Sequence, residues 1–395
     1  MCDCPPASGA VSRRTLMGAL GIGSAAALTA LAAPASASPS ASSTVAAWSA
    51  HGSPRHPSLP ARSSQPKGTA LTLLGTSGGP PADYVRAGIS SVLTVEGRNY
   101  VVDAGRSSVT QYLNAGLEFS ALSGMFITHL HADHIADYYN YFLLEGNVTN
   151  DSNDNLAGPL TVYGPGSAGA LPPAVRPPVA TVAPDDPTPG ITELTRKLTE
   201  GYAYSHNIFI RETAIRNVDT LTDVHDIVVP EVGASALGDT APPMAPFRVF
   251  EDDRVSVSAI LVPHGPVFPS FAFRFDTEHG SVVFSGDTRA SDNVVRLARD
   301  ADVLVHEVLD LEFYQQLGVP APLLEHFKQG HTLTTEIGAL AERAGVETLV
   351  LSHLVPSNPG LFSDEQYLKK ARKGFSGRVH VGNDLDRLPL RAHRH

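Results

Sequence analysis

The sequence predicts an α+β fold in which two β-sheets pack face to face and helices cover their outer sides. Two strand-rich parts of the chain, one beginning near residue 69 and the other near residue 255, each end in segments with helical spacing. Two packed sheets with helices outside are a common way to bury the apolar faces of such segments. Hydrophobic residues make up 42% of the 395 residues and charged residues 17%, so the chain can bury a sizeable core.

The first strand-rich part has clear boundaries. An apolar strand at 70–75 ends at Gly75, and Gly116 closes a helical segment. A strand of the buried type at 124–128 runs directly into a histidine-rich segment. The remaining elements expected here are a hairpin of 89–96 and 99–103 joined by Gly97 and Arg98, a helix at 107–115 and a helix at 133–145.

Residues 146–253 lack a regular pattern. They contain proline-rich turns, one short strand at 160–163 and one helical segment from 191 to about 204. We interpret this stretch as an insertion over one edge of the core, and a lid is one role that such an insertion can have. The elements expected after it are strands at 255–262, 270–275 and 281–284, then a helix at 292–299, a strand at 303–305, a helix at 334–344, a strand at 348–351, a helix at 364–373 and a strand at 378–381. The main domain is therefore placed at 69–388, with a flexible tail at 389–395.

The N-terminal segment has the pattern of an export signal. Arg13 and Arg14 precede an apolar run that continues to about residue 33, and three small residues follow it. This pattern indicates a twin-arginine signal at 1–37, recognition by the twin-arginine export machinery and a secreted or otherwise extracytoplasmic location. A transmembrane anchor is the alternative, but the run is short and rich in alanine and glycine.

Charge and cysteine content limit the partners. The formal net charge is −11, so nucleic acid is an unfavourable partner and no stable membrane association is expected. Cys2 and Cys4 are the only cysteines, so without the signal any metal site must use His, Asp or Glu. Residues 38–68 are rich in Ser, Pro and Ala and are expected to form a disordered linker. The sequence does not determine the oligomeric state.

The main functional signal is a cluster of potential metal ligands at the end of a buried strand: His129, His131, Asp133 and His134. His129 and His131 are two residues apart, so in an extended loop they point to the same side. Asp133 and His134 begin the next helix and can face a second ion. Imidazoles with a carboxylate suit a pair of divalent ions about 3.5–4 Å apart. The alternative is a polar helix start in which Asp133 is only a cap.

With this His-x-His-x-Asp-His motif the sequence resembles the metallo-β-lactamase superfamily, over about 69–145 and 254–385. The resemblance implies a four-layer αββα sandwich with a long insertion before the third metal motif. It also implies three further ligands, each at a strand end: His264, Asp287 and His353. One ion would then be held by His129, His131 and His264 and the other by Asp133, His134 and His353, with Asp287 bridging them.

These later residues have plainer alternatives. His264 and Asp287 could be ordinary turn residues, and His353 could be a buried histidine with a hydrogen-bond partner. Asp103 matches a carboxylate that orients a ligand histidine in the superfamily, and its alternative is a simple Asp-x-Gly turn.

Finer matches resemble the branch that includes ribonuclease Z and the secreted arylsulfatases. They are the glycine-rich opening at 74–80, the His306-Glu307 pair and His331. The resemblance implies that His331 lies by the leaving group, where it would donate a proton, and that Glu307 holds it. The alternatives are a histidine at a helix start and a solvated glutamate. Asp287 is not cysteine, which excludes the β-lactamases with a Cys ligand.

Within this branch, ribonuclease Z fits less well than the arylsulfatases. Its tRNA-clamping arm lies between the third and fourth motifs, where this chain has only a short spacer between His264 and Asp287. The segment 128–137 is closer to the arylsulfatase-like group.

These features predict an exported hydrolase with two divalent ions, zinc being expected and Mn²⁺ or Fe²⁺ remaining open. The substrate would be a small-molecule ester, a sulfate or phosphate (di)ester, attacked by a water activated between the ions, with Asp133 orienting it. The alternatives are a lactone or carboxyl-ester hydrolase on the same site, a ribonuclease Z-type endonuclease and a non-catalytic metal-binding protein. The aromatic residues after the motif either line a substrate pocket or, more often, face the core: Tyr138, Tyr139, Tyr141, Phe142, Phe268 and Phe271.

Overall fold

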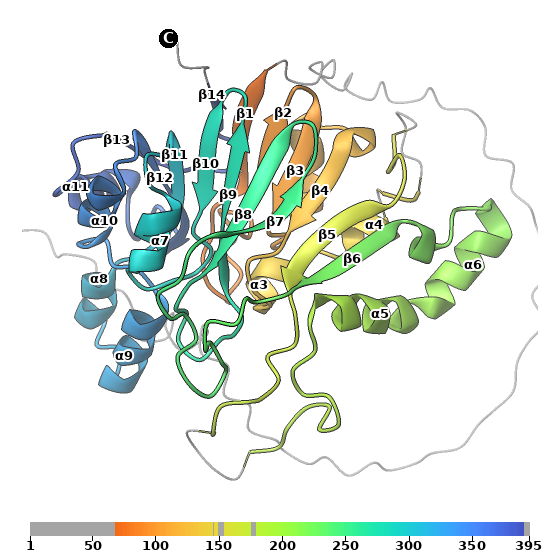
Figure 1. Ribbon diagram of the computed structural model, residues 1–395, viewed down its shortest axis with the longest axis horizontal. Helices are drawn as coiled ribbons and strands as arrows, with labels where there is room; N and C mark the ends of the chain where they lie inside the picture. Colours follow the sequence, from red (N-terminus) through yellow and green to blue (C-terminus); the bar gives the residue numbers. More distant parts are fainter. Residues whose placement is uncertain (1–67, 145, 149–153, 175–178, 391–395) are drawn as a thin grey trace, which may run out of the picture. The chain divides into compact units, whose positions relative to one another are not determined.

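The computed structural model describes residues 68–144, 146–148, 154–174 and 179–390 (Figure 1). The expected signal at 1–37 and the linker up to residue 67 lie outside the described residues. None of the helices in the described part is long and apolar enough to cross a membrane.

The strands within the described residues form two mixed sheets. The first has the strand order β14 (Arg387–Leu390), β1 (Thr69–Gly75), β2 (Ser90–Val95), β3 (Arg98–Val102), β4 (Leu122–Phe126), β5 (Leu160–Pro165) and β6 (Thr222–Ile227). The second has the order β13 (Arg378–Val381), β12 (Thr348–Val355), β11 (Val303–Leu309), β10 (Gly280–Phe284), β9 (Phe271–Thr277), β8 (Val255–Leu261) and β7 (Phe247–Glu251). In both sheets an antiparallel portion continues into a parallel one.

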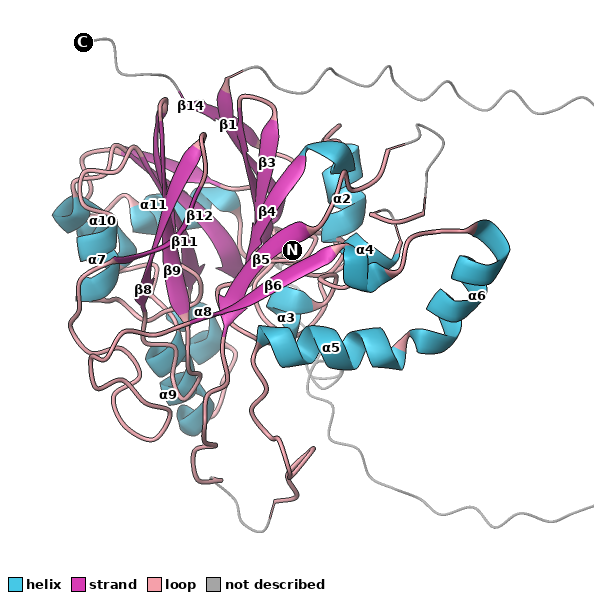
Figure 2. Cartoon of the chain, turned by 45° about the vertical axis from the view of Figure 1, so that its right-hand side comes forward, coloured by secondary structure: helices cyan, strands magenta, loops and turns pink. Residues whose placement is uncertain are grey.

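Helices lie on the outer side of each sheet, which gives the expected four-layer αββα sandwich (Figures 1 and 2). The first sheet is covered by α2 (Ser108–Asn114), α3 (Ala132–Ile135), α4 (Asn140–Leu143) and α5 (Ile191–Gly201). The second is covered by α7 (Asp292–Leu297), α10 (Ile337–Ala344) and α11 (Asp364–Ala371). Three further helices are α6 (Ala203–Thr213), α8 (Leu311–Gln316) and α9 (Ala321–Gly330).

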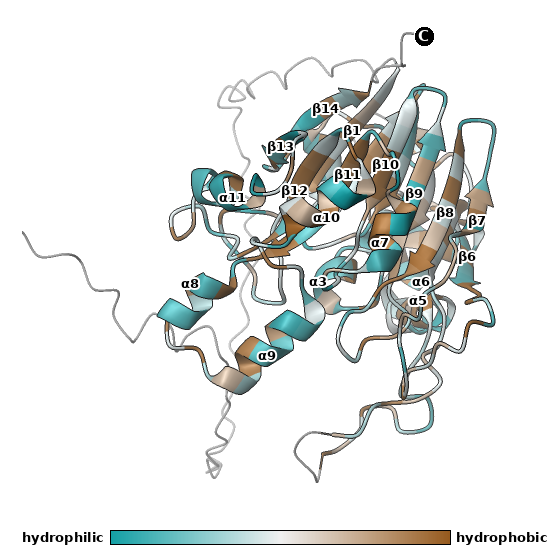
Figure 3. Ribbon diagram, turned by 60° about the vertical axis from the view of Figure 1, so that its left-hand side comes forward, coloured by the Kyte–Doolittle hydropathy of each residue, from teal (hydrophilic) through white to brown (hydrophobic). Residues whose placement is uncertain are grey.

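Alternating side chains of the first sheet fill two separate cores. Tyr100 and Phe126 face the second sheet, where the Phe126 ring centre lies 5.0 Å from that of Phe275. Their neighbours Val101 and Met125 face the outer helices. This alternation follows from the two-residue period of a strand, and Figure 3 shows β8 and β12 mainly in hydrophobic colours.

Three sequence-based expectations differ from the structure. The helix expected at 133–145 is two short helices, α3 and α4, because the N–H of Asp137 donates to Ala104 O and its carboxylate accepts the N–H of Val109. The stretch 146–253 contributes β5, β6 and β7 to the sheets rather than only covering an edge. Residues 389 and 390 end β14 and do not belong to a flexible tail; residues 391–395 lie outside the described part.

The sequence analysis did not predict the strands β6 and β7, and there is a physical reason for this. Each is the last strand of its sheet, and most of their side chains are exposed or half-buried. A strand at a sheet edge needs no apolar alternation, so its sequence resembles that of a loop.

Candidate metal centre

The candidate ligands gather where several strands end. The segment of His129 to His134 follows β4, His264 follows β8 and Asp287 follows β10. The strands β10, β11 and β12 are parallel neighbours, so Asp287, Glu307 and His353 meet at the same edge of the second sheet. Side chains from distant parts of the chain can therefore converge on one point.

All seven predicted ligands are brought together in two clusters. The potential ligand atoms of each cluster lie within 4.8 Å of one another. Asp287 belongs to both clusters, so its two carboxylate oxygens can serve two ions. The members are His129, His131, His264 and Asp287 in the first cluster and Asp133, His134, Asp287 and His353 in the second.

Unpartnered polar atoms show that the clusters fit metal ions. Among the buried polar atoms of the described residues that lack a hydrogen-bond partner are His129 Nε2, Asp133 Oδ1, His134 Nε2 and Asp287 Oδ1. Buried polar atoms nearly always have a partner, and here they converge. Imidazole nitrogens and carboxylate oxygens are the donor set of zinc and related divalent ions. The chain can therefore hold a dinuclear metal site.

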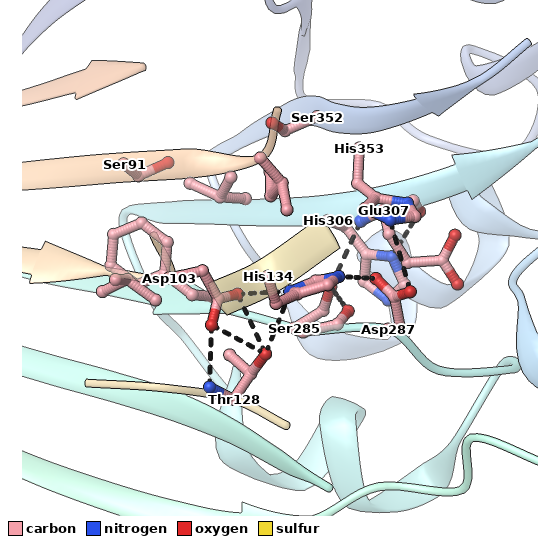
Figure 4. A pocket seen from close by; sticks show the side chains of 15 residues that line it. Ser91, Asp103, Thr128, His134, Ser285, Asp287, His306, Glu307, Ser352 and His353 are labelled. Atoms are coloured by element: carbon pink, nitrogen blue, oxygen red, sulfur yellow. Dashed lines mark hydrogen bonds and ion pairs between the residues drawn. The ribbon is translucent and has the colours of Figure 1, made fainter. Parts of the chain in front are cut away.

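Second contacts fix the orientation of two ligand histidines. His134 Nδ1 lies 2.8 Å from Asp103 Oδ2, and Asp103 also accepts hydrogen bonds from the backbone N–H and hydroxyl of Thr128 (Figure 4). His264 Nδ1 lies 2.8 Å from Gly330 O. Each contact offers an acceptor to Nδ1 and so turns Nε2 toward the other ligands, where it can bind a metal.

His353 reaches the centre through a distortion of its strand. The pairing of β11 with β12 shifts at this point, because Glu307 pairs with Ser352 and Val308 with Leu354. His353 is the extra residue, and its φ of 44° lies in the left-handed region. Bulges and such strained backbone commonly occur where a side chain must be redirected at a functional site.

The glycine-rich opening of the sequence lies against this histidine. A Cβ atom on Gly78 would lie 2.5 Å from His353 Nδ1. Only glycine therefore permits the backbone to approach the ligand so closely. Arg86 helps to anchor the opening, because its guanidinium donates to Thr76 Oγ1 and forms a salt bridge with Asp364.

Burial and charge set the protonation of the ligands. Burial lowers the pKa of His264 to about 3 and that of His129 well below its usual value, so both are neutral and can bind metal. Burial would raise the pKa of Asp133, but His353 and His134 lower it to about 2. Asp133 is therefore ionised at neutral pH.

Glu307 and His331 form a pair beside both clusters, and the His331 ring centre lies 5.2 Å from that of His264 in the first cluster. His331 Nδ1 lies 3.4 Å from Glu307 Oε1, and the His331 ring stacks over His353 with ring centres 5.8 Å apart. Glu307 is buried and accepts the N–H groups of Thr288 and Thr332, so it does not take the solvated alternative. Burial lowers the pKa of His331, but Glu307 and the carboxylates of Asp287 and Asp133 outweigh it and raise that pKa to about 9.

Other residues separate into those that sequence reasoning missed and those that belong to the core. Thr128 and the carbonyl of Gly330 were not identified, since neither carries a metal-ligand or acid–base signal of its own. The tyrosines after the motif are buried in the outer core of the first sheet, as the core alternative had it: Tyr138, Tyr139 and Tyr141. Phe142 and Phe271 are also core residues, whereas Phe268 lines a cleft.

Comparisons with known proteins agree with this geometry. A family model described as the Metallo-beta-lactamase superfamily matches residues 84–353. Ribonuclease Z of Mycobacterium bovis (strain BCG / Pasteur 1173P2) is 33% identical over 325 residues, which cover 82% of this chain and 99% of the relative. Ribonuclease Z of Mycobacterium tuberculosis (strain ATCC 25618 / H37Rv) is 32% identical with the same coverage.

Solved structures show the same fold. Human tRNase Z, short form, has a TM-score of 0.53 at 19% identity, covering 81% of this chain and 99% of that one. A metallo-beta-lactamase fold protein from Bacillus subtilis has a TM-score of 0.50 at 18% identity, with the same coverage. Together with the ligand clusters, these matches show that the chain belongs to the metallo-β-lactamase superfamily, in its ribonuclease Z branch.

Proposed function

We propose that this metallo-hydrolase cleaves phosphodiester bonds. The observation that carries the proposal is that Asp287 is shared between two complete ligand clusters, with the His331–Glu307 pair beside them. The relatives named Ribonuclease Z support a phosphodiester as the substrate. They disfavour the sulfate ester of an arylsulfatase-like enzyme, which the sequence analysis had favoured. A phosphodiester and a sulfate monoester are both tetrahedral monoanions, so the same site can bind either, and the test must compare them.

The residues of the site divide the chemistry among themselves. Bound divalent ions would polarise the ester oxygens and make water easier to deprotonate. Ionised Asp133 accepts a hydrogen bond from the attacking water and orients it. Glu307 favours the protonated form of His331 and keeps it in position, so that His331 can donate its proton to the departing oxygen. Removal of that proton donor leaves the departing alkoxide uncompensated.

The protein's charge favours a small phosphodiester over RNA. The chain has 40 acidic and 29 basic residues, and binding of a polynucleotide depends on neutralising many phosphates with Lys and Arg. The protruding α5–α6 segment (Figure 2) carries mixed charges, since Arg196 pairs with Glu193 and Lys197 with Asp186. RNA remains a second candidate because the relatives are ribonucleases by name.

A substrate panel tests the proposal. The purified protein, loaded with zinc, would be assayed with bis(4-nitrophenyl) phosphate, 4-nitrophenyl phosphate, 4-nitrophenyl sulfate, a lactone and a 3′-extended precursor tRNA. The expected result is the highest kcat/KM for the phosphodiester, two equivalents of bound metal and loss of activity with a chelator. A higher kcat/KM for the sulfate or the lactone, or activity that survives metal removal, would overturn it.

A pair of histidine variants supplies the control. His264→Ala should lose the first ion and nearly all activity. His279→Ala removes a histidine whose ring contacts Thr69 and Glu96 on the opposite part of the fold, so it should retain both metal and activity. Equal behaviour of the two variants would contradict the assignment of His264.

Export is a further part of the proposal and rests only on the Arg13-Arg14 pattern. A fusion of residues 1–68 to a reporter that is active only outside the cytoplasm should be exported, and Arg13→Lys with Arg14→Lys should block it. A reporter that is exported equally without the arginine pair would refute this route.

A further inference from the structure

A cleft of about 380 Å³ lies directly beside the first ligand cluster. One wall contains Leu130, which stands between the ligands His129 and His131, and Val267, whose N–H donates to the carbonyl of the ligand His264 at 3.1 Å. The other wall comes from the loop between β5 and α5 and from Leu194. In Figures 1 and 2, α3 and the start of α5 lie side by side at this place. We call this feature the apolar cleft.

The lining of the apolar cleft has a distinct chemistry. No residue that lines it within the described part of the chain carries a charge, and Thr188 supplies its one hydroxyl. The rest are aliphatic residues, prolines and Phe268. Such a lining offers no positive charge to a phosphate group and favours an uncharged apolar group.

The cleft is large enough and preformed enough to bind such a group. An engineered apolar cavity of roughly 150 Å³ takes up benzene, so about 380 Å³ holds more than one aromatic ring or a medium alkyl chain. Prolines form much of the wall, including Pro165, Pro187 and Pro266. Because proline fixes φ, little conformational freedom is lost when a ligand binds.

The position of the cleft decides which part of the ester it receives. His331 and Glu307, where the leaving oxygen takes its proton, do not line the cleft, and neither does any described residue of β11 or β12. One wall of the cleft adjoins His129, His131 and His264. His331 also contacts His264, with ring centres 5.2 Å apart, but from outside the cleft. A group in the cleft is therefore the alcohol that stays on phosphorus, while the leaving group departs past His331.

We propose that the apolar cleft binds the retained, hydrophobic alcohol moiety of the substrate, so that the natural substrate is a small phosphodiester with one alkyl or aryl group and not a polynucleotide. This inference rests on the proposed phosphodiesterase activity. It also assigns a specificity role to the described residues of 166–172 and 187–189 that line the cleft, none of which belongs to either ligand cluster.

A series of 4-nitrophenyl alkyl phosphates tests this inference, with methyl, butyl and hexyl as the retained group. The leaving group stays constant, so the chemistry step is matched. We expect kcat/KM to rise by about fourfold for each methylene that becomes buried, until the cleft is filled. A kcat/KM that does not change with chain length would overturn the inference.

Two variants connect this dependence to the cleft. Ala170→Trp places a large side chain in the cleft, and the matched control Val182→Trp places one at a site that is 88% exposed in the same loop and does not line the cleft. Ala170→Trp should lose the chain-length dependence, measured as the ratio of the kcat/KM values for the hexyl and methyl esters. Val182→Trp should retain the dependence.

The outcomes separate this inference from the proposed function. If the unaltered protein does not hydrolyse the methyl ester, the phosphodiesterase proposal fails. If it hydrolyses all three esters equally, or if Ala170→Trp keeps the full dependence, only the cleft assignment fails. Should Ala170→Trp not fold, Ala168→Trp, which also lines the cleft, carries the same expectation. A higher kcat/KM for precursor tRNA than for the hexyl ester would overturn the inference of a small substrate and identify RNA as the substrate.

Discussion

Replacement of Asp103 by asparagine should selectively weaken the second metal site, although Asp103 binds no metal itself. Its carboxylate is buried and accepts hydrogen bonds from His134 Nδ1, from the backbone N–H of Thr128 and from the Thr128 hydroxyl, at distances between 2.8 and 3.0 Å. Asparagine has nearly the same size, and it tolerates the left-handed φ of 58° found at this position. The substitution therefore changes charge and acceptor number with little effect on packing.

The expected size of the effect follows from those contacts. An amide has one acceptor oxygen for donors on two sides, so one buried N–H or O–H loses its partner at a cost of about 1–3 kcal/mol. His134 also loses the negative charge that fixes its proton on Nδ1 and makes Nε2 a stronger ligand. Loss of such a contact typically lowers metal affinity by about 10–100-fold. The first cluster contains no ligand that Asp103 contacts directly, so its affinity should change much less.

The assay is a competition between the protein and a chromophoric zinc chelator, with elemental analysis for stoichiometry. The unaltered protein should bind two ions, and Asp103→Asn should bind the second about 10–100-fold more weakly. Asp137→Asn is the control, since Asp137 accepts the N–H of Val109 at 3.0 Å and is not a member of either cluster. Two ions bound by Asp103→Asn with unaltered affinities would refute this reasoning.

Three further substitutions probe the proton donor, the glycine-rich opening and the core. His331→Ala should keep both ions but lower kcat by about 10²–10⁴-fold, and an unaltered kcat would remove His331 from proton transfer. Gly78→Ala should lower the affinity for the ion of the second cluster in the chelator competition, because the new Cβ would lie 2.5 Å from His353 Nδ1. An unchanged affinity would show that His353 can move and still bind the metal. Phe126→Ala should lower the free energy of unfolding in urea by about 3–5 kcal/mol, since the ring packs between the two sheets, and a much smaller loss would mean that this core can repack.

Much of the fold was accessible from local patterns. The strand β1, the hairpin β2–β3 and helix α2 lie close to where the spacing of apolar residues and the positions of Gly97 and Gly116 predicted them. These elements were predicted correctly because their signals are local: the three strands are buried apolar runs, and the turn residues Gly97 and Gly116 have positive φ. The edge strands β6 and β7 lacked a buried face and could not be recognised in this way.

The sequence by itself determined the kind of metal site, because the spacing of His129, His131, Asp133 and His134 after a strand restricts what those side chains can bind. The sequence pointed to the distant ligands only through the resemblance to a family. The structure shows that parallel strands bring Asp287 and His353 to the same edge of the second sheet. Only the tertiary structure showed the contacts of Asp103 with His134, the bulge at His353 and the apolar cleft beside the first cluster. Each of these features arises where segments far apart in the chain pack against one another. The spacing of residues within a short segment cannot predict such packing.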